Sequence, residues 1–303
     1  MAPDDVTAAE QRSGTGEVGR SHSVLEPADL AVPLVFASPH SGHAYPADFV
    51  AASRLGALAL RRSEDAFIDR IFAAAPRFGA PLLRAHFPRV FIDPNREPYE
   101  LDPAMFDGPL PDYVNVRSPR VAAGLGTIAR VVANGEEVYR GKLRFADAST
   151  RIDAHYFPYH ATLQALLEAT RRRFGCWLLV DCHSMPSIGG PMDADPGLRR
   201  LDIVLGDCHG TACAPEVIEC AERTLRGLGF TVRRNVPYAG GYTTRHYSKP
   251  GCGMHTLQIE VNRALYMDEQ RIVPSAGMER VVAAMTTLIG DLSRIAPDLL
   301  RPA

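Results

Sequence analysis

The chain has 303 residues, of which 46% are hydrophobic and 22% are charged, and its formal net charge is −2. This length and apolar content suffice for a large core in one large domain or two modest ones, and the near-neutral charge provides no basic surplus for a nucleic-acid partner. No window reaches the roughly 18 apolar residues of a membrane span, and no apolar secretion signal opens the chain, so we expect a cytoplasmic protein whose function depends on a local site.

The first 25 residues are polar and rich in Gly, Ser and Thr, which is typical of a disordered tail. We expect one folded domain over residues 26–303, because no low-complexity linker or internal repeat divides that part. Pro- and Gly-rich stretches at 102–116 and 184–200 are expected to form long surface loops that border a functional site.

Short apolar runs between chain-breaking residues predict the strands. In chain order these runs are 33–38, 81–86, 89–93, 177–182, 201–205, 230–236 and 255–261. A 3.6-residue periodicity predicts helices at 63–77, 149–173, 214–228 and 275–295. We expect the first helix to begin at Ser63, because the acidic Glu64 and Asp65 that follow suit the positive end of a helix. Strands that alternate with helices indicate an α/β sandwich around a parallel or mixed sheet.

Polar side chains follow four of the predicted strands at the point where each strand ends. They are His40 and His43, then Asp93, Asn95 and Arg96, then Asp181 and His183, and finally Glu260 and Asn262. The carboxyl ends of strands in α/β sheets commonly face a ligand crevice, and burial of unpaired polar groups costs about 1–3 kcal/mol each. Four such groups together therefore predict a functional site.

Imidazoles together with a carboxylate are ligands that suit a divalent transition metal, most often zinc. A catalytic zinc ion keeps three protein ligands and lowers the pKa of a bound water to about 7. A further carboxylate then accepts and returns the proton, and an arginine can hold a substrate carboxylate or an oxyanion. Manganese, iron or cobalt could occupy the same ligands.

Six ordered motifs give the chain a resemblance to the N-formylglutamate amidohydrolases over most of residues 33–285. The motifs are PHSG (39–42), SEDAFID (63–69), IDPNR (92–96), DCHSM (181–185), GGYTTRHY (240–247) and LQIEVNRALYMDE (257–269). Two further segments, GTIARVVANGEEVYRGKL (126–143) and RIDAHYFPYH (151–160), are similar to one branch of that family.

The resemblance implies a three-layer sandwich, with a mixed central sheet flanked by helices and one zinc ion, similar to zinc carboxypeptidases and aspartoacylases. It implies a zinc-dependent amidohydrolase that converts N-formyl-L-glutamate to formate and the free amino acid, a step of histidine degradation. A small-molecule substrate is then the expected partner. Neither nucleic acid nor a membrane is expected, and the oligomeric state stays open.

The resemblance also assigns the metal ligands. His40 and His183 are the two histidine ligands, and Asp65 is the favoured third ligand. Glu64, Asp69 and His43 stay open as alternatives for that third position. His43 is otherwise expected to orient a ligand or to face the substrate, since partners of this kind commonly surround metal ligands.

The resemblance assigns Glu260 as the general base of the reaction. The alternative is a buried salt bridge between Glu260 and Arg263 or Arg245. Asn95 and Arg96 resemble the pair that holds the substrate carboxylate in the wider fold, and the alternative for them is a turn cap followed by a surface arginine.

Other residues of the motifs are expected to complete the site. Arg245 is assigned as a catalytic cation that also helps to bind the substrate, and His246 lies next to it. Tyr242 and Arg130 are further candidates for substrate binding. Asp181 either orients an imidazole or has a structural role.

Three rival functions stay open. The first is a zinc carboxypeptidase or amidase that acts on another N-acyl amino acid, and the second is a non-catalytic binding protein on the same scaffold. The third is a cysteine hydrolase centred on Cys182 or Cys252. Because neighbouring residues on a strand point to opposite faces, Cys182 is poorly placed to use His183 as its base. The six cysteines are expected to be reduced thiols.

Overall fold

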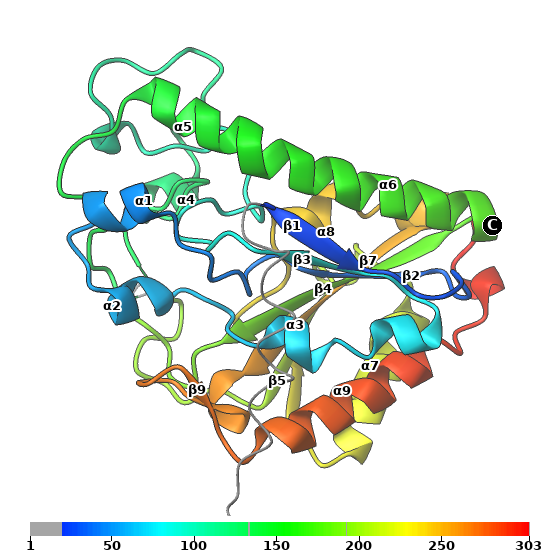
Figure 1. Ribbon diagram of the computed structural model, residues 1–303. Helices are drawn as coiled ribbons and strands as arrows, with labels where there is room; N and C mark the ends of the chain where they lie inside the picture. Colours follow the sequence, from blue (N-terminus) through cyan, green and yellow to red (C-terminus); the bar gives the residue numbers. More distant parts are fainter. Residues whose placement is uncertain (1–19, 133, 192, 303) are drawn as a thin grey trace, which may run out of the picture.

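The computed structural model of the protein (Figure 1) describes residues 20–132, 134–191 and 193–302. A seven-stranded sheet crosses the centre of the molecule in the order β1-β3-β2-β4-β7-β5-β6. Its strands are β1 (His22–Leu25), β2 (Leu34–Ser38), β3 (Leu82–Ala85), β4 (Trp177–Met185), β5 (Ile203–Gly206), β6 (Val232–Arg234) and β7 (Met254–Asn262). The short strands β8 (Met267–Asp268) and β9 (Val273–Pro274) form a separate pair.

The sheet is mixed in direction. Strands β3, β2, β4 and β7 are parallel neighbours, whereas β1 is antiparallel to β3 and β5 is antiparallel to β7. Strand β6 is parallel to β5. Because β2, β4 and β7 run the same way, their carboxyl ends meet at one edge of the sheet, and the register places His183 of β4 beside Glu260 of β7.

Helices cover both faces of the sheet (Figure 1). On one face lie α3 (Ile68–Ile71), the 3₁₀ turn η2 (Ala75–Phe78), α7 (Pro215–Gly227) and α9 (Met278–Leu292). On the other face lie α1 (Ala47–Ala52), α2 (Ala57–Arg61) and one long helix made of α5 (Phe145–Arg151), the π-helical turn η4 (Ile152–Tyr156) and α6 (Phe157–Phe174). The remaining short elements are η3 (Pro103–Met105), α4 (Pro119–Ala122), α8 (Tyr242–His246), η5 (Pro250–Cys252), η6 (Arg263–Leu265) and η7 (Pro297–Leu299).

Alternating side chains of the inner strands supply a separate core on each face. On β4, Leu178, Val180 and Cys182 point into the core with α3, α7 and α9, whereas Trp177 and Leu179 point into the core with α6. Coverage on both faces explains why these strands read as continuous apolar runs in the sequence. The predicted α/β architecture with a mixed central sheet between helix layers is therefore confirmed.

Most of the predicted elements are confirmed, with ends shifted by a few residues. The strands predicted at 33–38, 81–86, 177–182, 201–205, 230–236 and 255–261 correspond to β2, β3, β4, β5, β6 and β7. The helices predicted at 149–173, 214–228 and 275–295 correspond to the α5–α6 helix, α7 and α9.

Two predicted elements are wrong. Residues 89–93 form a turn rather than a strand, because Pro88 and Pro94 bracket the run and the Phe91 N–H donates to the Pro88 carbonyl at 2.9 Å. Residues 63–77 do not form one helix from Ser63, since Phe67 has a left-handed φ of 67° and only short turns follow it.

Strand β1 was not predicted and lies inside the expected tail. Its residues pair with β3 in an antiparallel register from His22 opposite Ala85 to Leu25 opposite Leu82, so the tail boundary at residue 25 is wrong for β1. Residues 1–19 lie outside the described residues. The rest of the tail and the single-domain division therefore stay predictions.

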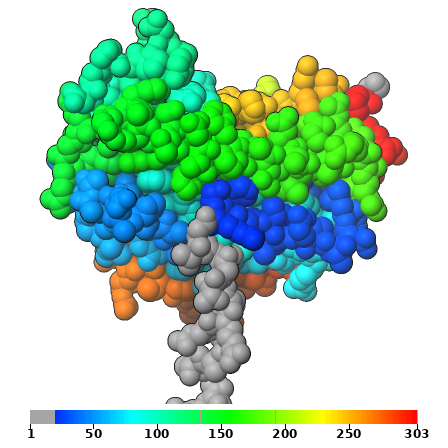
Figure 2. Space-filling view, turned by 45° about the horizontal axis from the view of Figure 1, so that its top comes forward, coloured from blue at the N-terminus to red at the C-terminus, as the bar shows by residue number. Residues whose placement is uncertain are grey.

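The described residues of the segment between β3 and α5 contribute no strand to the central sheet. In Figure 2 part of it, in cyan to teal, gathers at one end of the α5–α6 helix. It supplies α4 and part of the wall of a cavity at the carboxyl ends of β2, β4 and β7. Within the described ranges, no helix has both the length and the apolar character needed to cross a membrane.

Candidate active site

A cavity of about 220 Å³ opens at the carboxyl edge shared by β2, β4 and β7. Its polar lining includes His40, Asp65, Arg89, Asp93, Asn95, Arg96, Arg120, His183, Ser184, Asp193, Gln258, Glu260 and Arg263. Every predicted strand end that carried a candidate residue thus contributes to this cavity. This is the position where α/β sheets commonly bind ligands.

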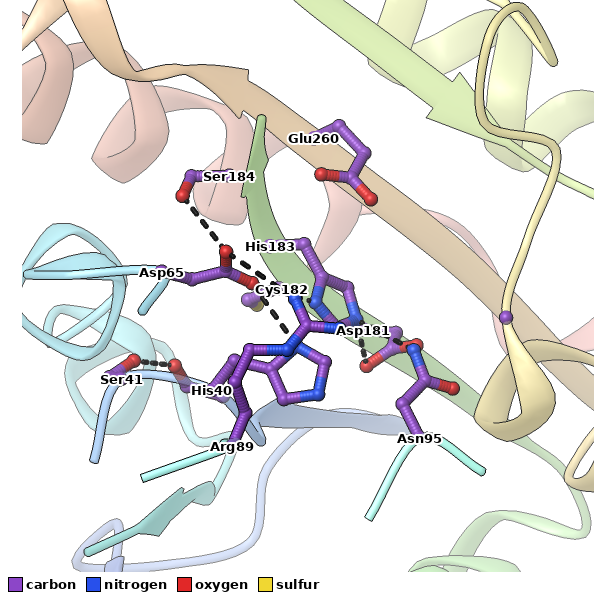
Figure 3. A network of polar contacts seen from close by, with 12 residues as sticks. His40, Ser41, Asp65, Arg89, Asn95, Asp181, Cys182, His183, Ser184 and Glu260 are labelled. Carbon is purple, nitrogen blue, oxygen red and sulfur yellow. Dashed lines mark hydrogen bonds and ion pairs between the residues drawn. The ribbon is translucent and has the colours of Figure 1, made fainter. Parts of the chain in front are cut away.

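A buried His–Asp–His cluster lies in the cavity (Figure 3). The Oδ2 atom of Asp65 is 3.2 Å from Nδ1 of His40 and 3.0 Å from Nδ1 of His183. The three side chains are at most 3% exposed. Ligand atoms around a tetrahedral zinc ion, each about 2.0–2.1 Å from the metal, lie about 3.3 Å from one another. The spacing of this cluster therefore fits a small divalent cation.

The second nitrogen of each imidazole faces another carboxylate. His40 Nε2 donates to Asp93 Oδ1 at 2.7 Å. His183 Nε2 lies 2.9 Å from Asp181 Oδ1 and 3.3 Å from the Asn95 amide nitrogen.

The two contacts of His183 Nε2 compete, since Asp181 can only accept a proton and the Asn95 amide can only donate one. Neither Asp181 oxygen completes a hydrogen bond of good angle, so the contact with His183 is an ion pair at short distance. We assign the Nε2 proton to the Asp181 side, because a cation on Nδ1 leaves Nε2 as a donor. Nδ1 of each imidazole is then the atom available to a cation beside Asp65, as is common for histidine ligands backed by a carboxylate.

The negative charge of the Asp65 carboxylate needs a positive charge close to it, between this carboxylate and the two imidazoles. Burial acts to raise the pKa of Asp65, but hydrogen bonds from His183 and His40 hold this pKa well below its usual range. Burial acts to lower the pKa of His183, but Asp181 and Asp65 raise it well above its usual value. Protons on the imidazoles or a metal ion can supply this positive charge, so the donor set fits a metal.

Asp65 is held in place through its other oxygen. Oδ1 accepts from Ser184 Oγ at 3.1 Å and from the Arg263 guanidinium at 3.0 Å. Arg263 also donates to Ser184 Oγ at 3.0 Å. The backbone N–H of Asp65 donates to the His40 carbonyl at 3.0 Å. These contacts leave Oδ2 directed at the two imidazoles.

The alternatives for the third ligand lie elsewhere. Glu64 accepts from Arg61 and from the Tyr45 hydroxyl. Asp69 lies 3.7 Å from Arg84, and His43 is exposed, with Nδ1 3.4 Å from the Ser41 carbonyl. The geometry therefore favours Asp65.

Glu260 projects into the cavity from β7, next to His183 (Figure 3). It accepts a hydrogen bond from Gln258 Nε2 at 3.0 Å and forms no ion pair within the described part of the chain. The expected alternative, a salt bridge with Arg263 or Arg245, is not observed, since Arg263 binds Asp65 instead. Burial raises the pKa of Glu260 to about 8, and a carboxylate with such a pKa can exchange protons near neutral pH.

Arg89 lies against the cluster from the opposite side (Figure 3). Its guanidinium donates to Asp93 at 2.9 Å and is 4.0 Å from Asp65 Oδ1.

The predicted pair Asn95 and Arg96 is buried in the wall of the cavity. The carbonyl oxygen of Asn95 accepts from the Arg96 guanidinium at 2.7 Å, and its side-chain oxygen accepts from the Thr243 N–H at 2.8 Å. Arg96 is only 7% exposed, which excludes the alternative of a surface arginine.

The other sequence candidates do not line the cavity. Arg245 and His246 are exposed on α8, where Arg245 donates to the Gly240 carbonyl and His246 stacks on Tyr242. Arg130 pairs with Asp102 at 2.7 Å and lines a separate surface pocket. The position of a residue within a matching motif does not determine where its side chain points.

Several residues of the cavity wall are not among the site residues predicted from the sequence. Arg89 begins the run predicted as a strand, where a residue four positions away would lie about 13 Å along the chain. The observed turn instead brings its guanidinium to 2.9 Å from Asp93. Arg263, which the salt-bridge alternative assigns to Glu260, binds Asp65 instead. Gln258, two residues before Glu260 on β7, could have been found from the two-residue period of a strand.

The fold and the cavity define a mixed α/β protein with a buried His–Asp–His cluster at the carboxyl edge of its sheet. The sequence matches the family described as N-formylglutamate amidohydrolase over residues 32–267. The chain belongs to the N-formylglutamate amidohydrolase family.

Named relatives support this membership. The N-formylglutamate deformylase of Pseudomonas aeruginosa is 31% identical over 243 residues, covering 79% of this chain and 84% of the relative. That of Pseudomonas putida is 29% identical over 249 residues, covering 78% and 83%. The crystal structure of N-formylglutamate amidohydrolase from Ralstonia eutropha JMP134 is 36% identical, covers 89% of this chain and 95% of its own, and superposes with a TM-score of 0.80.

Proposed function

We propose that the protein hydrolyses the formyl amide of N-formyl-L-glutamate to formate and L-glutamate with one divalent metal ion, zinc by ligand type. The observation that carries the proposal is the buried cluster of His40, Asp65 and His183 with Glu260 on the wall of the same cavity. The names of the Pseudomonas and Ralstonia relatives supply the substrate.

His40, Asp65 and His183 would hold the metal ion. A divalent ion in such a site supplies Lewis-acid activation of water and of a carbonyl group. Asp93 and Asp181 would keep the Nε2 protons of the imidazoles in place. The similarity to zinc carboxypeptidases, which the family resemblance implies, stays a prediction.

Glu260 would act as general base and then as general acid. It takes a proton from the attacking water and returns it to the amine that leaves as the C–N bond breaks. Its raised pKa suits both roles, since burial favours the protonated form and the cationic groups near it favour the ionised form. Gln258 fixes the carboxylate by a hydrogen bond of 3.0 Å.

Arg89 is placed to stabilise the oxyanion of the reaction. The guanidinium lines the cavity beside Asp65 and is held by Asp93. A fixed cation at the point where negative charge develops contributes to rate without reorganisation. Asn95, fixed by Thr243, has its amide nitrogen beside His183 and would help to orient the substrate.

Formate release from N-formyl-L-glutamate by the purified protein tests the proposal. We expect formate that disappears after chelation and returns when zinc is added. Bound metal without formate would move the search to other N-acyl amino acids, the rival enzyme class. Absence of both metal binding and turnover would favour the non-catalytic alternative. A role in histidine degradation and a cytoplasmic location stay predictions that depend on this substrate.

A further inference from the structure

Four arginine side chains of the described residues line the cavity that holds the His–Asp–His cluster, and they differ in whether a carboxylate pairs with them. They are Arg89, Arg96, Arg120 and Arg263. Arg89 is bound to Asp93 at 2.9 Å, and Arg263 is bound to Asp65 at 3.0 Å. Both of these guanidiniums are therefore partly neutralised by the carboxylates of the site itself.

Arg96 is also committed to the protein. Its Nε atom donates to the Leu125 carbonyl at 2.7 Å, a terminal nitrogen donates to the Asn95 carbonyl at 2.7 Å, and Asp93 lies 3.5 Å away. This buried guanidinium connects two parts of the cavity wall, its own segment and the one that carries Leu125. Its remaining N–H groups are few, because these contacts use part of its five donors.

Arg120 is different. It is exposed, it lines the cavity, and its side chain has no hydrogen bond or ion pair within the described ranges. Its charge nevertheless acts on the site: the pKa of Arg96 is lowered to about 10, first by burial and also by the charges of Arg120 and Arg89. Arg120 thus adds to this side of the cavity a positive charge that no described carboxylate pairs with, and such a charge attracts an anion.

The backbone that carries Arg120 is fixed on the cavity wall. Ser118 caps α4 by accepting from the Val121 N–H at 3.0 Å, and the Leu125 N–H donates to the Arg120 carbonyl at 2.8 Å. Gly126 lies so close to the Glu100 carbonyl that a Cβ would overlap with it. The backbone of this part of the wall is therefore held by contacts within the protein, and it carries the exposed side chain of Arg120.

We propose that Arg120 binds the side-chain carboxylate of the substrate and so determines specificity for an acidic N-formyl amino acid. This inference rests on the proposed function. The α-carboxylate of the substrate lies next to the formyl nitrogen and must stay near the cluster, where Asn95 is available. The side-chain carboxylate lies two methylene groups further out, where an exposed cation can meet it in a two-pronged contact.

The test compares two substrates of nearly equal shape, N-formyl-L-glutamate and N-formyl-L-glutamine, in the full-length metal-loaded protein. Arg120→Gln should lower the preference for the acidic substrate by roughly 10- to 100-fold, mainly through KM, as expected for loss of a charge-assisted hydrogen bond. Arg120→Lys should restore part of the preference. Arg117→Gln, an exposed arginine just before α4 that does not line the cavity, should keep the wild-type ratio.

A second measurement separates this inference from the proposed function. Calorimetry gives the affinities of wild type and Arg120→Gln for L-glutamate and L-glutamine. Loss of the glutamate preference in the variant supports the role of Arg120, even if the wild type releases no formate and the proposed reaction is wrong. Equal preference in the two proteins, in binding and in turnover, would overturn the inference and leave the proposed reaction standing.

Discussion

The carboxylate behind His183 offers the sharpest test of the metal site. Asp181 is fully buried and 2.9 Å from His183 Nε2, and neither of its oxygens has a hydrogen bond to the residues that the structure describes. Asp93, the corresponding partner of His40, also binds Arg89, so its replacement would disturb more than the imidazole. Asp181→Asn removes one negative charge at nearly constant shape and changes little else.

The size of the effect follows from the geometry. A cation on Nδ1 of His183 would lie about 6–7 Å from the Asp181 carboxylate, given the width of the ring and a metal–nitrogen bond of about 2 Å. At an effective dielectric constant of about 20, one unit charge pair at that distance contributes about 2.5 kcal/mol. We therefore expect zinc affinity to fall by about 10- to 100-fold.

The assay is competition for zinc between the protein and a chromophoric chelator at pH 7.5. Asp69→Asn is the matched control, because Asp69 is an acidic neighbour that pairs with Arg84 and contacts neither imidazole. Circular dichroism and urea unfolding of the zinc-free proteins check that the fold is retained. An Asp181→Asn protein with affinity within twofold of wild type would refute the reasoning that Asp181 fixes the Nε2 proton.

Two further predictions concern Glu260 and His160. Glu260→Gln should keep the zinc content of the wild type and lower kcat by roughly 10²- to 10⁴-fold, the range for loss of a general base; near-normal kcat would exclude Glu260 from the chemistry. Burial lowers the pKa of His160 to about 4, against about 6.5 in the unfolded chain, so the unfolded state binds more protons between these values. Above pH 6.5 His160 should therefore cost no stability. Its effect should lower the free energy of unfolding by up to about 1.4 kcal/mol per pH unit as pH decreases from 6.5 toward 4. Urea unfolding at pH 7 and pH 4.5 should therefore show a smaller loss in His160→Gln than in wild type or in the control His209→Gln, a variant at an exposed site, and an equal loss in all three would contradict the assignment.

The strand residues of the site were predictable from local pattern. On a strand, alternate residues share a face, so Cys182 points into one core while Asp181 and His183 point to the other face of the sheet. The same alternation places Gln258 and Glu260 together on β7. Burial also raises the pKa of the Cys182 thiol well above its usual value, which agrees with the poor placement expected for a cysteine nucleophile.

The loop residues of the site were not predictable in this way. The spacing of apolar residues after Ser63 favours a helix, but the pattern carries no sign that the Asp65 N–H will bond to the His40 carbonyl. That contact joins segments 25 positions apart, and it wins over local helix propensity because it completes a buried polar network. The positions of the arginine side chains were the least predictable. Arg245 lies in a motif but is exposed, whereas Arg89 lies outside the motifs and lines the cavity.

The two oxygens of Asp65 have separate tasks, and this explains why this carboxylate rather than Glu64 meets the imidazoles. Oδ1 accepts from Ser184, which lies on β4, and from Arg263, which directly follows β7. The edge of the sheet therefore fixes the plane of the carboxylate. Oδ2 is then left as a single ligand atom with one orientation. Because a buried carboxylate is stable only when its charge is matched, the same contacts that complete the fold also set the third position of the cluster, and metal affinity and folding stability should change together when Arg263 or Ser184 is altered.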